Sequence, residues 1–356
     1  MVNGVTGMNT AILGVSGYSG SVLYKLLKEH PKVDKVNLYS RKPRRSLAEA
    51  VTAFKNQPES LQEYDPQAIM AENDVLFLAT PAGVSSQLAS VFMEAKFPVI
   101  DLSGDLRLKK ATSYEKWYQK PATSYEKWYQ KPVTATKLLA QATYGLAEFE
   151  PVGTYIANPG CYATATLLAL APLVKEDLLQ LDSIIVDAKS GLAGAGKKLT
   201  ESSHYAYINE NAQAYKVNCH QHIPEIVQEL QTWNDELEAI QFTTTLIPIT
   251  RGIMVSAYAK VKPGFAQADL EAVFTKYYHD KKWVRFSGSD LPAIKDVIQS
   301  NYCDIGLSYN PVTNTVLVVS VIDNLLKGAS GQAVQNFNKL FGFEETLGLP
   351  VIPAWP

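Results

Sequence analysis

The first 157 residues alternate between short apolar runs and longer amphipathic stretches. The apolar runs predict strands over residues 9–13, 35–39, 74–79 and 98–102. After the first of these, Leu23, Leu26 and Leu27 recur at helical spacing, which predicts a helix over residues 21–29. Strands that alternate with helices are typical of a parallel sheet. The pattern therefore predicts an α/β domain with a Rossmann-like, doubly wound sheet.

The pattern changes after residue 157. The predicted strands cover residues 183–187, 242–247, 254–261, 303–309 and 315–322, the last two as a hairpin. The predicted helices cover residues 164–171, 268–279 and 330–341, and the first of them should end near Pro172. We expect a second, α+β domain with a mostly antiparallel sheet over residues 158–327. The first domain should cover residues 8–157 and be joined by a C-terminal helix within residues 328–356.

Composition narrows the class of protein. The 356 residues are 46% hydrophobic and 19% charged, which is enough to bury two cores. The net charge of −2 and the lack of a long Lys/Arg cluster argue against nucleic acid as the main partner. Three cysteines are too few for a disulfide framework, and no apolar run approaches membrane-spanning length. We therefore expect a soluble, cytoplasmic protein.

A glycine-rich loop joins the first predicted strand to the first helix. Gly14, Gly17 and Gly20 stand three residues apart, which lets the backbone turn tightly and brings a pyrophosphate to the helix N-terminus. An ordinary strand-to-helix turn is the alternative, but the strand before and the amphipathic helix after are what a dinucleotide fingerprint requires. The other loop residues expected at the cofactor are Ser16, Tyr18 and Ser19.

The second predicted strand ends in Ser40 and Arg41, followed by more basic residues. A carboxylate at this position would bind the ribose 2′-hydroxyl of NAD, whereas hydroxyl and guanidinium groups suit the 2′-phosphate of NADP. A solvated basic loop is the alternative. The sequence favours NADP.

A lone cysteine stands where a strand and a turn lead into a helix. Residues 156–157 predict the end of the strand, Pro159 and Gly160 the turn, and residues 164–171 the helix. The unpaired N–H groups and the positive dipole end of such a helix favour a thiolate and can hold an oxyanion. A buried core thiol is the alternative. We predict that Cys161 is a nucleophile.

A second chemical segment spans residues 219–226. His220 and His222 cannot share one face of a helix and Pro224 breaks regularity, so we expect a loop or a helix entry. The spacing of these histidines and Cys219 matches no common zinc pattern, so no metal is predicted. A histidine delivered to a cysteine as general acid and base is the stronger interpretation.

These residues carry a family resemblance. Residues 156–165 resemble a segment of the N-acetyl-γ-glutamyl-phosphate reductases, NADPH enzymes of arginine biosynthesis. Further segments resemble the family in the same order, namely residues 14–20, 101–107, 144–146, 189–191, 220–225, 251–252 and 322–328. A departure is Ala82, where many relatives have histidine. The resemblance implies a Rossmann-like NADP domain, a second domain shared with aspartate-semialdehyde dehydrogenase, and a homotetramer or homodimer.

The resemblance also implies roles for single residues. Cys161 would attack an acyl phosphate to give a thioester, NADPH would reduce it, and His220, oriented by Glu225, would supply a proton. The implied substrate contacts are Arg107, Asn158, Tyr144 and Arg251, and the further cofactor contacts are Ser190, Gly191 and Asn324. Each of two of these substrate contacts has an equally favoured alternative. Arg251 could instead form a surface ion pair, and Tyr144 could instead be a core residue. Alternatives for the whole chain are a related acyl-phosphate reductase such as aspartate-semialdehyde dehydrogenase and a non-catalytic NADP-binding sensor.

A tandem duplication generates a testable prediction. Residues 111–121 are followed at once by an identical copy, residues 122–132, which points to a recent or artificial event. Deleting residues 122–132 should leave activity intact and raise stability by removing exposed Trp and Tyr, because a longer loop costs only about 0.6 kcal/mol per doubling. Thermal melting and an activity assay of each single-copy deletion check this. Inactive or insoluble deletion proteins would show that the duplicate is part of the fold.

Overall fold

The chain divides into two compact units. The computed structural model describes residues 7–41, 45–109, 113, 116 and 139–354, so nearly all of the duplication lies outside the described residues. The first unit comprises Met1–Pro159 and Ala329–Leu349, and the second comprises Gly160–Gly328 and Pro350–Pro356.

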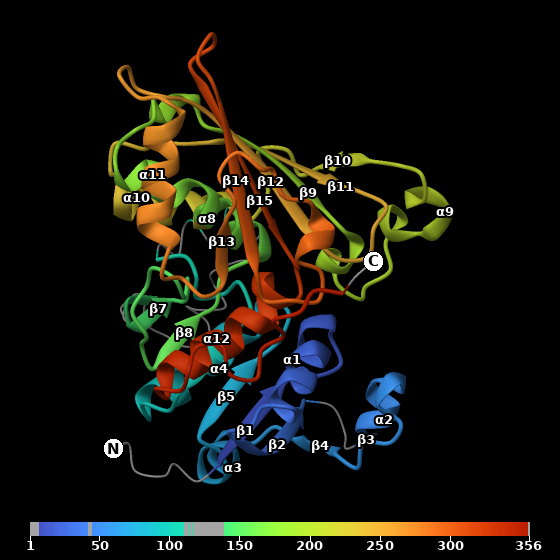
Figure 1. Cartoon of the computed structure of the whole chain (residues 1–356). Coiled ribbons are helices and arrows are strands. Elements are labelled where there is room, and N and C mark those ends of the chain that lie inside the picture. The colour runs from blue at the N-terminus through green and yellow to red at the C-terminus, as the bar shows by residue number, and fades with distance from the viewer. Residues whose placement is uncertain (1–6, 42–44, 110–112, 114–115, 117–138, 355–356) are drawn as a thin grey trace. The chain divides into compact units, whose positions relative to one another are not determined.

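An eight-stranded sheet forms the centre of the first unit, in the order β3-β4-β2-β1-β5-β6-β8-β7 (Figure 1). Its strands are β1 (Met8–Leu13), β2 (Val33–Ser40), β3 (Arg45–Ser46), β4 (Ser60–Glu63), β5 (Val75–Leu78), β6 (Val99–Asp101), β7 (Ala142–Tyr144) and β8 (Tyr155–Ala157). Only the β3–β4 pair is antiparallel among these described strands. The six strands from β4 to β8 in this order, numbered by their succession in the chain without β3 and β7, have the order 3-2-1-4-5-6. This is the order of a dinucleotide-binding fold, which confirms the predicted α/β class.

Helices cover both faces of this sheet. They are α1 (Tyr18–Lys28), α2 (Leu47–Ala50), α3 (Pro66–Glu72), α4 (Ser85–Glu94) and α12 (Gly331–Leu340). Successive side chains of a strand point to opposite faces. Accordingly Leu76 and Leu78 of β5 join the apolar cluster that includes Phe92 of α4, whereas the ring of Phe77 lies 5.9 Å from that of Phe337 in α12. Thus α12, from the far end of the chain, completes the core of the first unit.

The second unit is built on a seven-stranded sheet in the order β10-β11-β9-β12-β15-β14-β13. Its strands are β9 (Ile185–Ser190), β10 (Gln213–Tyr215), β11 (Gln241–Leu246), β12 (Ile253–Lys260), β13 (Val284–Phe286), β14 (Cys303–Asn310) and β15 (Thr315–Ile322). Four of its six described pairings are antiparallel, which confirms the predicted mostly antiparallel sheet. The helices are α8 (Cys161–Lys175), α9 (Tyr205–Ile208), α10 (Ile223–Trp233) and α11 (Gln267–Tyr278). Of these, α8 packs on β12 and β15 and contacts α10 and α11 (Figure 1).

The prediction that the helix after Cys161 ends near Pro172 is wrong. Helix α8 continues through Pro172 to Lys175. Proline has no N–H to give to the carbonyl four residues earlier, which is that of Leu168. The hydroxyl of Tyr278 in α11 donates to this Leu168 carbonyl at 2.5 Å and replaces the missing helical bond. A long-range contact therefore offsets a local helix-breaking residue.

The C-terminal tail differs from the sequence prediction. Residues 328–356 were expected to join the first domain, but Pro350–Pro356 belongs to the second unit. Two main-chain hydrogen bonds hold this tail there, from Asn301 N–H to the Pro350 carbonyl at 3.1 Å and from Ala354 N–H to the Ile298 carbonyl at 2.8 Å.

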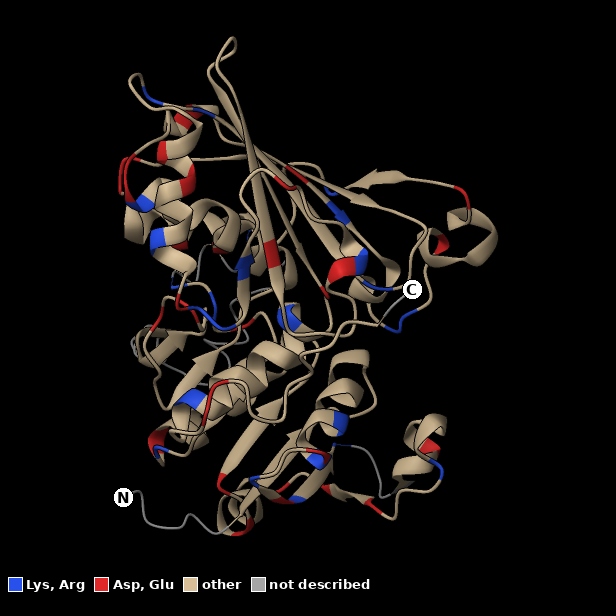
Figure 2. Ribbon diagram, viewed as in Figure 1, with Lys and Arg blue, Asp and Glu red and all other residues tan. Residues whose placement is uncertain are grey.

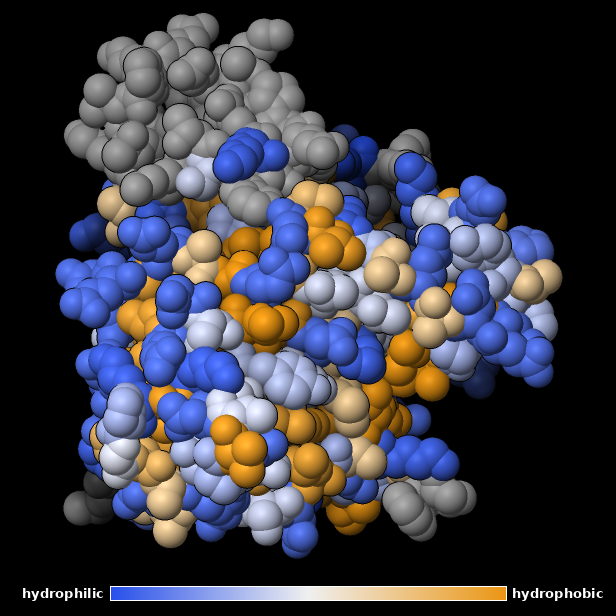
Figure 3. All heavy atoms as spheres, turned by 90° about the horizontal axis from the view of Figure 1, so that it is seen from above, coloured by the Kyte–Doolittle hydropathy of each residue, from blue (hydrophilic) through white to orange (hydrophobic). Residues whose placement is uncertain are grey.

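The surface carries both signs of charge. Figure 2 shows basic and acidic residues interspersed along the ribbons of both units. Figure 3 shows apolar side chains scattered among polar ones on the face that it presents. Within the described part of the chain, no helix is both long and apolar enough to span a bilayer.

Candidate active site

Cys161 is the first residue of α8. The residue before it, Gly160, is the N-cap and has extended backbone, with φ −73° and ψ 155°. Gly160 has no side chain that could bond the first-turn N–H groups of α8, and the start of a helix is a favourable place for negative charge. Cys161 is half-buried and is not in a disulfide. This setting favours a thiolate, as the sequence predicts.

A buried carboxylate fixes the peptide immediately before the cysteine. Glu225, only 1% exposed, lies in the first turn of α10, and its Oε1 accepts the N–H of Gly160 at 2.8 Å. A hydrogen bond to a buried carboxylate is among the stronger ones in proteins. The contact joins the N-terminal ends of α8 and α10, and so determines where Cys161 is presented.

The ring of His222 lies against Gly160. A Cβ atom at residue 160 would come within 2.3 Å of Nε2 of this histidine, so only glycine fits. His222 is the N-cap residue of α10, as expected for a helix entry. The sequence predicts the chemistry of this segment at His220. The closeness of His222 to the cysteine loop is a tertiary contact, which the sequence does not reveal.

His220 is enclosed by other rings. Its centroid lies 5.2 Å from Tyr162, 5.9 Å from Tyr215 and 4.7 Å from His222. Its Nδ1 accepts the main-chain N–H of His222 at 3.2 Å, so the proton of the neutral ring belongs on Nε2. Burial above all, together with His222 and Lys216, lowers the pKa of His220 from 6.5 to about 2. In this state His220 is a neutral hydrogen-bond donor.

Two tyrosine hydroxyls join the same cluster. Tyr162 follows the cysteine directly, and its hydroxyl lies 2.9 Å from that of Tyr215 in β10. Burial raises the pKa of both phenols, that of Tyr215 to about 12, and Cys161 adds to both shifts. Neither tyrosine was predicted, because a single aromatic residue carries no chemical pattern in the sequence.

Arg251 is held by a buried acid. Its Nη2 donates to Oδ1 of Asp323 at 2.9 Å, while the guanidinium keeps 23% of its side-chain surface exposed and Asp323 keeps none. The next residue, Gly252, donates its N–H to Oδ1 of Asn324 at 2.7 Å. The Nδ2 group of this buried Asn324 has no hydrogen-bond partner among the described residues. Arg251 is thus a cation with a fixed direction, and Asn324 offers a buried N–H donor that has no partner among the described residues.

Gly191 follows Ser190 at the end of β9. A Cβ atom at residue 191 would lie 2.9 Å from the carbonyl oxygens of Ile249 and Thr250. Glycine is therefore required for this close approach of two backbones, whatever its predicted role at the cofactor.

The glycine loop of the first unit fits a dinucleotide phosphate. Gly14 has φ +106°, and a Cβ atom there would lie 2.4 Å from the carbonyl oxygen of Ala79. A Cβ atom at Gly20 would lie 2.2 Å from the carbonyl of Gly14. Gly17 is the N-cap of α1 and has no side chain that could bond the first N–H groups of that helix, a helix end that suits an anion. Ser16 lies in this turn and Tyr18 and Ser19 begin α1, whereas Ser40 and Arg41 lie at the end of the neighbouring β2.

Arg107 and Asn158 are tied into the main chain of the first unit. Arg107 donates from Nε to the Asn158 carbonyl at 2.8 Å and from Nη2 to the Leu102 carbonyl at 2.9 Å. The Asn158 side chain accepts from Asn336 at 3.1 Å and donates to the Ala329 carbonyl at 3.2 Å. These contacts give both residues a structural role, and their substrate contacts stay predictions. Tyr144, at the end of β7, is buried, and its substrate contact also stays a prediction.

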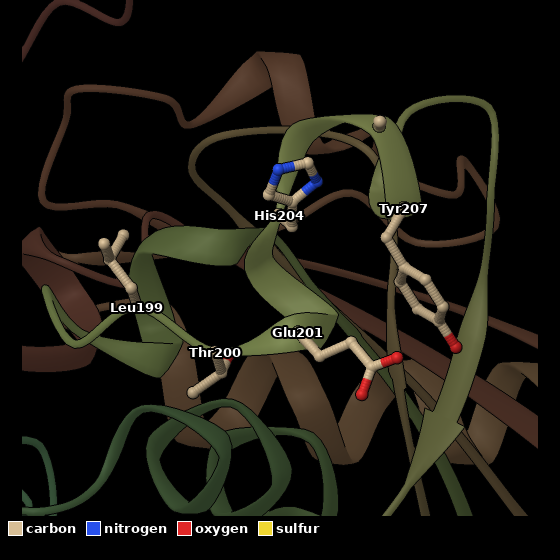
Figure 4. A pocket seen from close by; sticks show the side chains of 6 residues that line it. Leu199, Thr200, Glu201, His204 and Tyr207 are labelled. Carbon is tan, nitrogen blue, oxygen red and sulfur yellow. The ribbon is translucent and has the colours of Figure 1, made fainter.

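Metal ligands and a pocket outside the predicted site are two further features of the described residues. The described residues contain no group of three or more His, Cys, Asp or Glu side chains that could hold a metal ion. A pocket of about 600 Å³ in the second unit is lined by Leu199, Thr200, Glu201, His204, Ala206 and Tyr207 (Figure 4). None of these lining residues is among the predicted site residues.

Comparison with known proteins defines the class. The family model of the semialdehyde dehydrogenase NAD binding domain matches residues 9–153, and that of the semialdehyde dehydrogenase dimerisation domain matches residues 161–324. The fold resembles aspartate semialdehyde dehydrogenase with NADP from Candida albicans, with a TM-score of 0.67 and 15% identity over 94% of this chain and 98% of that chain. It also resembles aspartate semialdehyde dehydrogenase II from Vibrio cholerae, with a TM-score of 0.65 and 17% identity over 94% of this chain and 99% of that chain. The two units are thus semialdehyde dehydrogenase domains.

Sequence relatives are more specific. The chain is 52% identical to N-acetyl-gamma-glutamyl-phosphate reductase 2 of Lactiplantibacillus plantarum, over 98% of this chain and 100% of the relative. It is 51% identical to the N-acetyl-gamma-glutamyl-phosphate reductase of Limosilactobacillus fermentum, again over 98% and 100%. The chain belongs to the N-acetyl-gamma-glutamyl-phosphate reductase family, which confirms the resemblance found in the sequence.

The buried state of His220 predicts a pH dependence of stability. Because the pKa of His220 falls from 6.5 to about 2 on folding, below pH 6.5 the unfolded chain binds a proton that the folded chain does not. Stability should therefore be lost as the pH falls, by roughly 1–2 kcal/mol from this residue between pH 7.5 and 5. Chemical denaturation of wild type and His220→Gln at both pH values checks this. The acid-induced loss should be smaller in the variant, and equal losses would show that His220 is not the responsible group.

Proposed function

We propose that the protein reduces N-acetyl-glutamyl 5-phosphate to N-acetyl-glutamate 5-semialdehyde and phosphate with NADPH, as a step of arginine biosynthesis. The observation that carries the proposal is Cys161 at the uncapped start of α8, with its preceding peptide held by Glu225. The names of relatives at 51–52% identity over 98% of the chain support the choice of substrate.

Cys161 is the proposed nucleophile. Its thiolate attacks the carbonyl carbon of the acyl phosphate, the carbon–oxygen bond to phosphate breaks with its electron pair leaving on phosphate, and a thioester forms on the sulfur. The N–H groups at the start of α8 stabilise the thiolate before attack and oxygen charge during it. When bound, NADPH supplies a hydride. Release of the aldehyde then returns Cys161 as a thiolate for the next turnover.

The two histidines have different proposed tasks. His220, neutral with its proton on Nε2, donates a hydrogen bond to substrate oxygen rather than removing a proton. His222, whose ring touches Gly160, is the better placed group to exchange a proton with the thiol. Glu225 acts as a positioning residue through Gly160.

The anionic substrate requires a positive charge in the second unit in addition to the start of α8. Arg251 suits this role, because Asp323 fixes its direction while part of the guanidinium stays exposed. Arg107 and Asn158 would act through the main chain that precedes Gly160, and Tyr144 as a neutral substrate contact.

The proposed NADP-binding residues are those that the sequence predicts. The loop Gly14–Gly20 would hold the pyrophosphate, and Ser40 and Arg41 would bind the 2′-phosphate, because β2 ends without a carboxylate that would favour NAD. The unpartnered Nδ2 of Asn324 would serve an acceptor such as a carboxamide, with Ser190 and Gly191 at the end of strand β9. The match to a dimerisation domain over residues 161–324 supports a homodimer or homotetramer, which we place in the cytoplasm.

Substrate choice and the nucleophile are tested together. Phosphate-dependent NADP⁺ reduction should be much faster with N-acetyl-glutamate semialdehyde than with aspartate semialdehyde. Cys161→Ser should lose several orders of magnitude in kcat while its Kd for NADPH is unchanged, because an alkoxide is far less available than a thiolate near neutral pH. Cys219→Ser, at an exposed cysteine, is the matched control and should keep wild-type activity. A preference for aspartate semialdehyde, or an active Cys161→Ser variant, would contradict the proposal.

A further inference from the structure

We propose that Asp105 is a positioning residue for NADPH: it holds the loop after β5 against the glycine loop. The inference rests on the proposed function, because it concerns the cofactor which that reaction consumes. Asp105 touches no predicted substrate or cofactor atom and was not among the predicted site residues.

The side chain of Asp105 accepts several hydrogen bonds from the segment that follows β5. Its fully buried carboxylate accepts the N–H of Gly83 at 2.7 Å on Oδ1 and 2.9 Å on Oδ2. It also accepts the N–H of Ser86 at 3.0 Å and the hydroxyl of Ser85 at 3.1 Å. These residues lie in the turn between β5 and α4 and in the first turn of α4. The carboxylate therefore fixes the direction of the chain as it leaves β5.

The other side of Asp105 is linked to the next two strands. Its own N–H donates to the hydroxyl of Ser103 at 3.2 Å, and the N–H of Ser103 donates to Oδ1 of Asp101 at 2.8 Å. The Asp101 carboxyl in turn accepts the hydroxyl of Tyr155 in β8 at 2.9 Å. The side chains of Ser85 and Ser103 are also hydrogen-bonded to each other. One buried network thus joins the segments around the ends of β5, β6 and β8.

The segment held by Asp105 forms one wall of the glycine loop. A Cβ atom at Gly14 would lie 2.4 Å from the carbonyl oxygen of Ala79 and 3.4 Å from the N atom of Thr80, so the two backbones are in direct contact. The buried hydroxyl of Thr80 has no hydrogen-bond partner among the described residues and is left for a ligand. Gly14 and Thr80 follow β1 and β5, the neighbours at which the strand order reverses and where such sheets bind nucleotides.

Replacing the carboxylate disturbs this wall in a defined way. In Asp105→Asn the side chain keeps its size, but one acceptor oxygen becomes an NH₂ group that faces N–H donors of Gly83 and Ser86. The turn must move so that the new NH₂ group and the main-chain N–H groups no longer face each other. The segment at Ala79 and Thr80 moves with the turn. The glycine loop then loses its fixed neighbour, and NADPH binding is weakened while the chemical groups of the second unit are unchanged.

A matched control separates this role from simple stabilisation. Asp74, an exposed residue directly before β5, also accepts a main-chain N–H, that of Asn9 in β1 at 2.7 Å. This contact lies at the amino ends of β1 and β5, the opposite edge of the sheet from the glycine loop. Asp74→Asn therefore makes the same side-chain change at a main-chain contact that lies away from the wall of the loop.

The test is a fluorescence titration of NADPH against full-length wild type, Asp105→Asn and Asp74→Asn, together with thermal melting and steady-state kinetics. We expect the Kd and KM for NADPH of Asp105→Asn to rise at least about tenfold, with the KM for the semialdehyde within about twofold of wild type. Asp74→Asn should bind NADPH like wild type. An Asp105→Asn protein that melts earlier but binds NADPH like wild type would overturn the proposal.

If Asp105→Asn does not fold, Ser103→Ala decides the question. This variant removes the hydroxyl that accepts the N–H of Asp105 and leaves the carboxylate in place. Weaker NADPH binding supports the positioning role, and unchanged binding overturns it. Failure of wild type to bind NADPH would instead overturn the proposed function itself.

Discussion

The hydrogen bond from the N–H of Gly160 to the buried carboxylate of Glu225 is the contact on which the candidate site depends. A buried carboxylate is stable only when its oxygens are hydrogen-bonded, and such a bond contributes about 1.5–3 kcal/mol. Here it joins the first turn of α10 to the peptide before α8, so the two helix ends are fixed together. The direction of the Cys161 side chain follows from this arrangement.

Two consequences of this contact shape the chemistry. The close approach of α10 brings the ring of His222 so near to residue 160 that only glycine fits there. It also buries His220 among Tyr162, Tyr215 and His222, which keeps that imidazole neutral at physiological pH. The negative charge of a thiolate is then stabilised chiefly by the start of α8 and not by a charged His220. The glycine loop of the first unit relies on the same interaction between a helix start and negative charge. There the start of α1 offers main-chain N–H groups to a phosphate.

The parts of the structure that depend on neighbouring residues could be predicted from the sequence. The strand, glycine loop and helix over residues 8–28, and the placement of Cys161 at a helix start, are local patterns and agree with the structure. Long-range contacts could not be predicted. The partner of Glu225 lies 65 residues away, and the tyrosine that lets α8 continue through Pro172 lies 110 residues from the carbonyl it binds. One local detail could not be predicted either: the proton position on His220 depends on a hydrogen bond from the N–H two residues later, and this bond requires a loop geometry that the sequence does not specify.

The most direct test of the account is to trap the covalent intermediate. Enzyme mixed with N-acetyl-glutamate semialdehyde and NADP⁺ in the absence of phosphate, quenched with acid and digested, should yield one peptide that carries the N-acetyl-glutamyl group on Cys161 by mass spectrometry. Added phosphate should discharge this adduct, because phosphate is the group that takes the acyl chain from the sulfur. An acyl group found on Cys219 or Cys303, or NADPH formation without any adduct, would contradict the account.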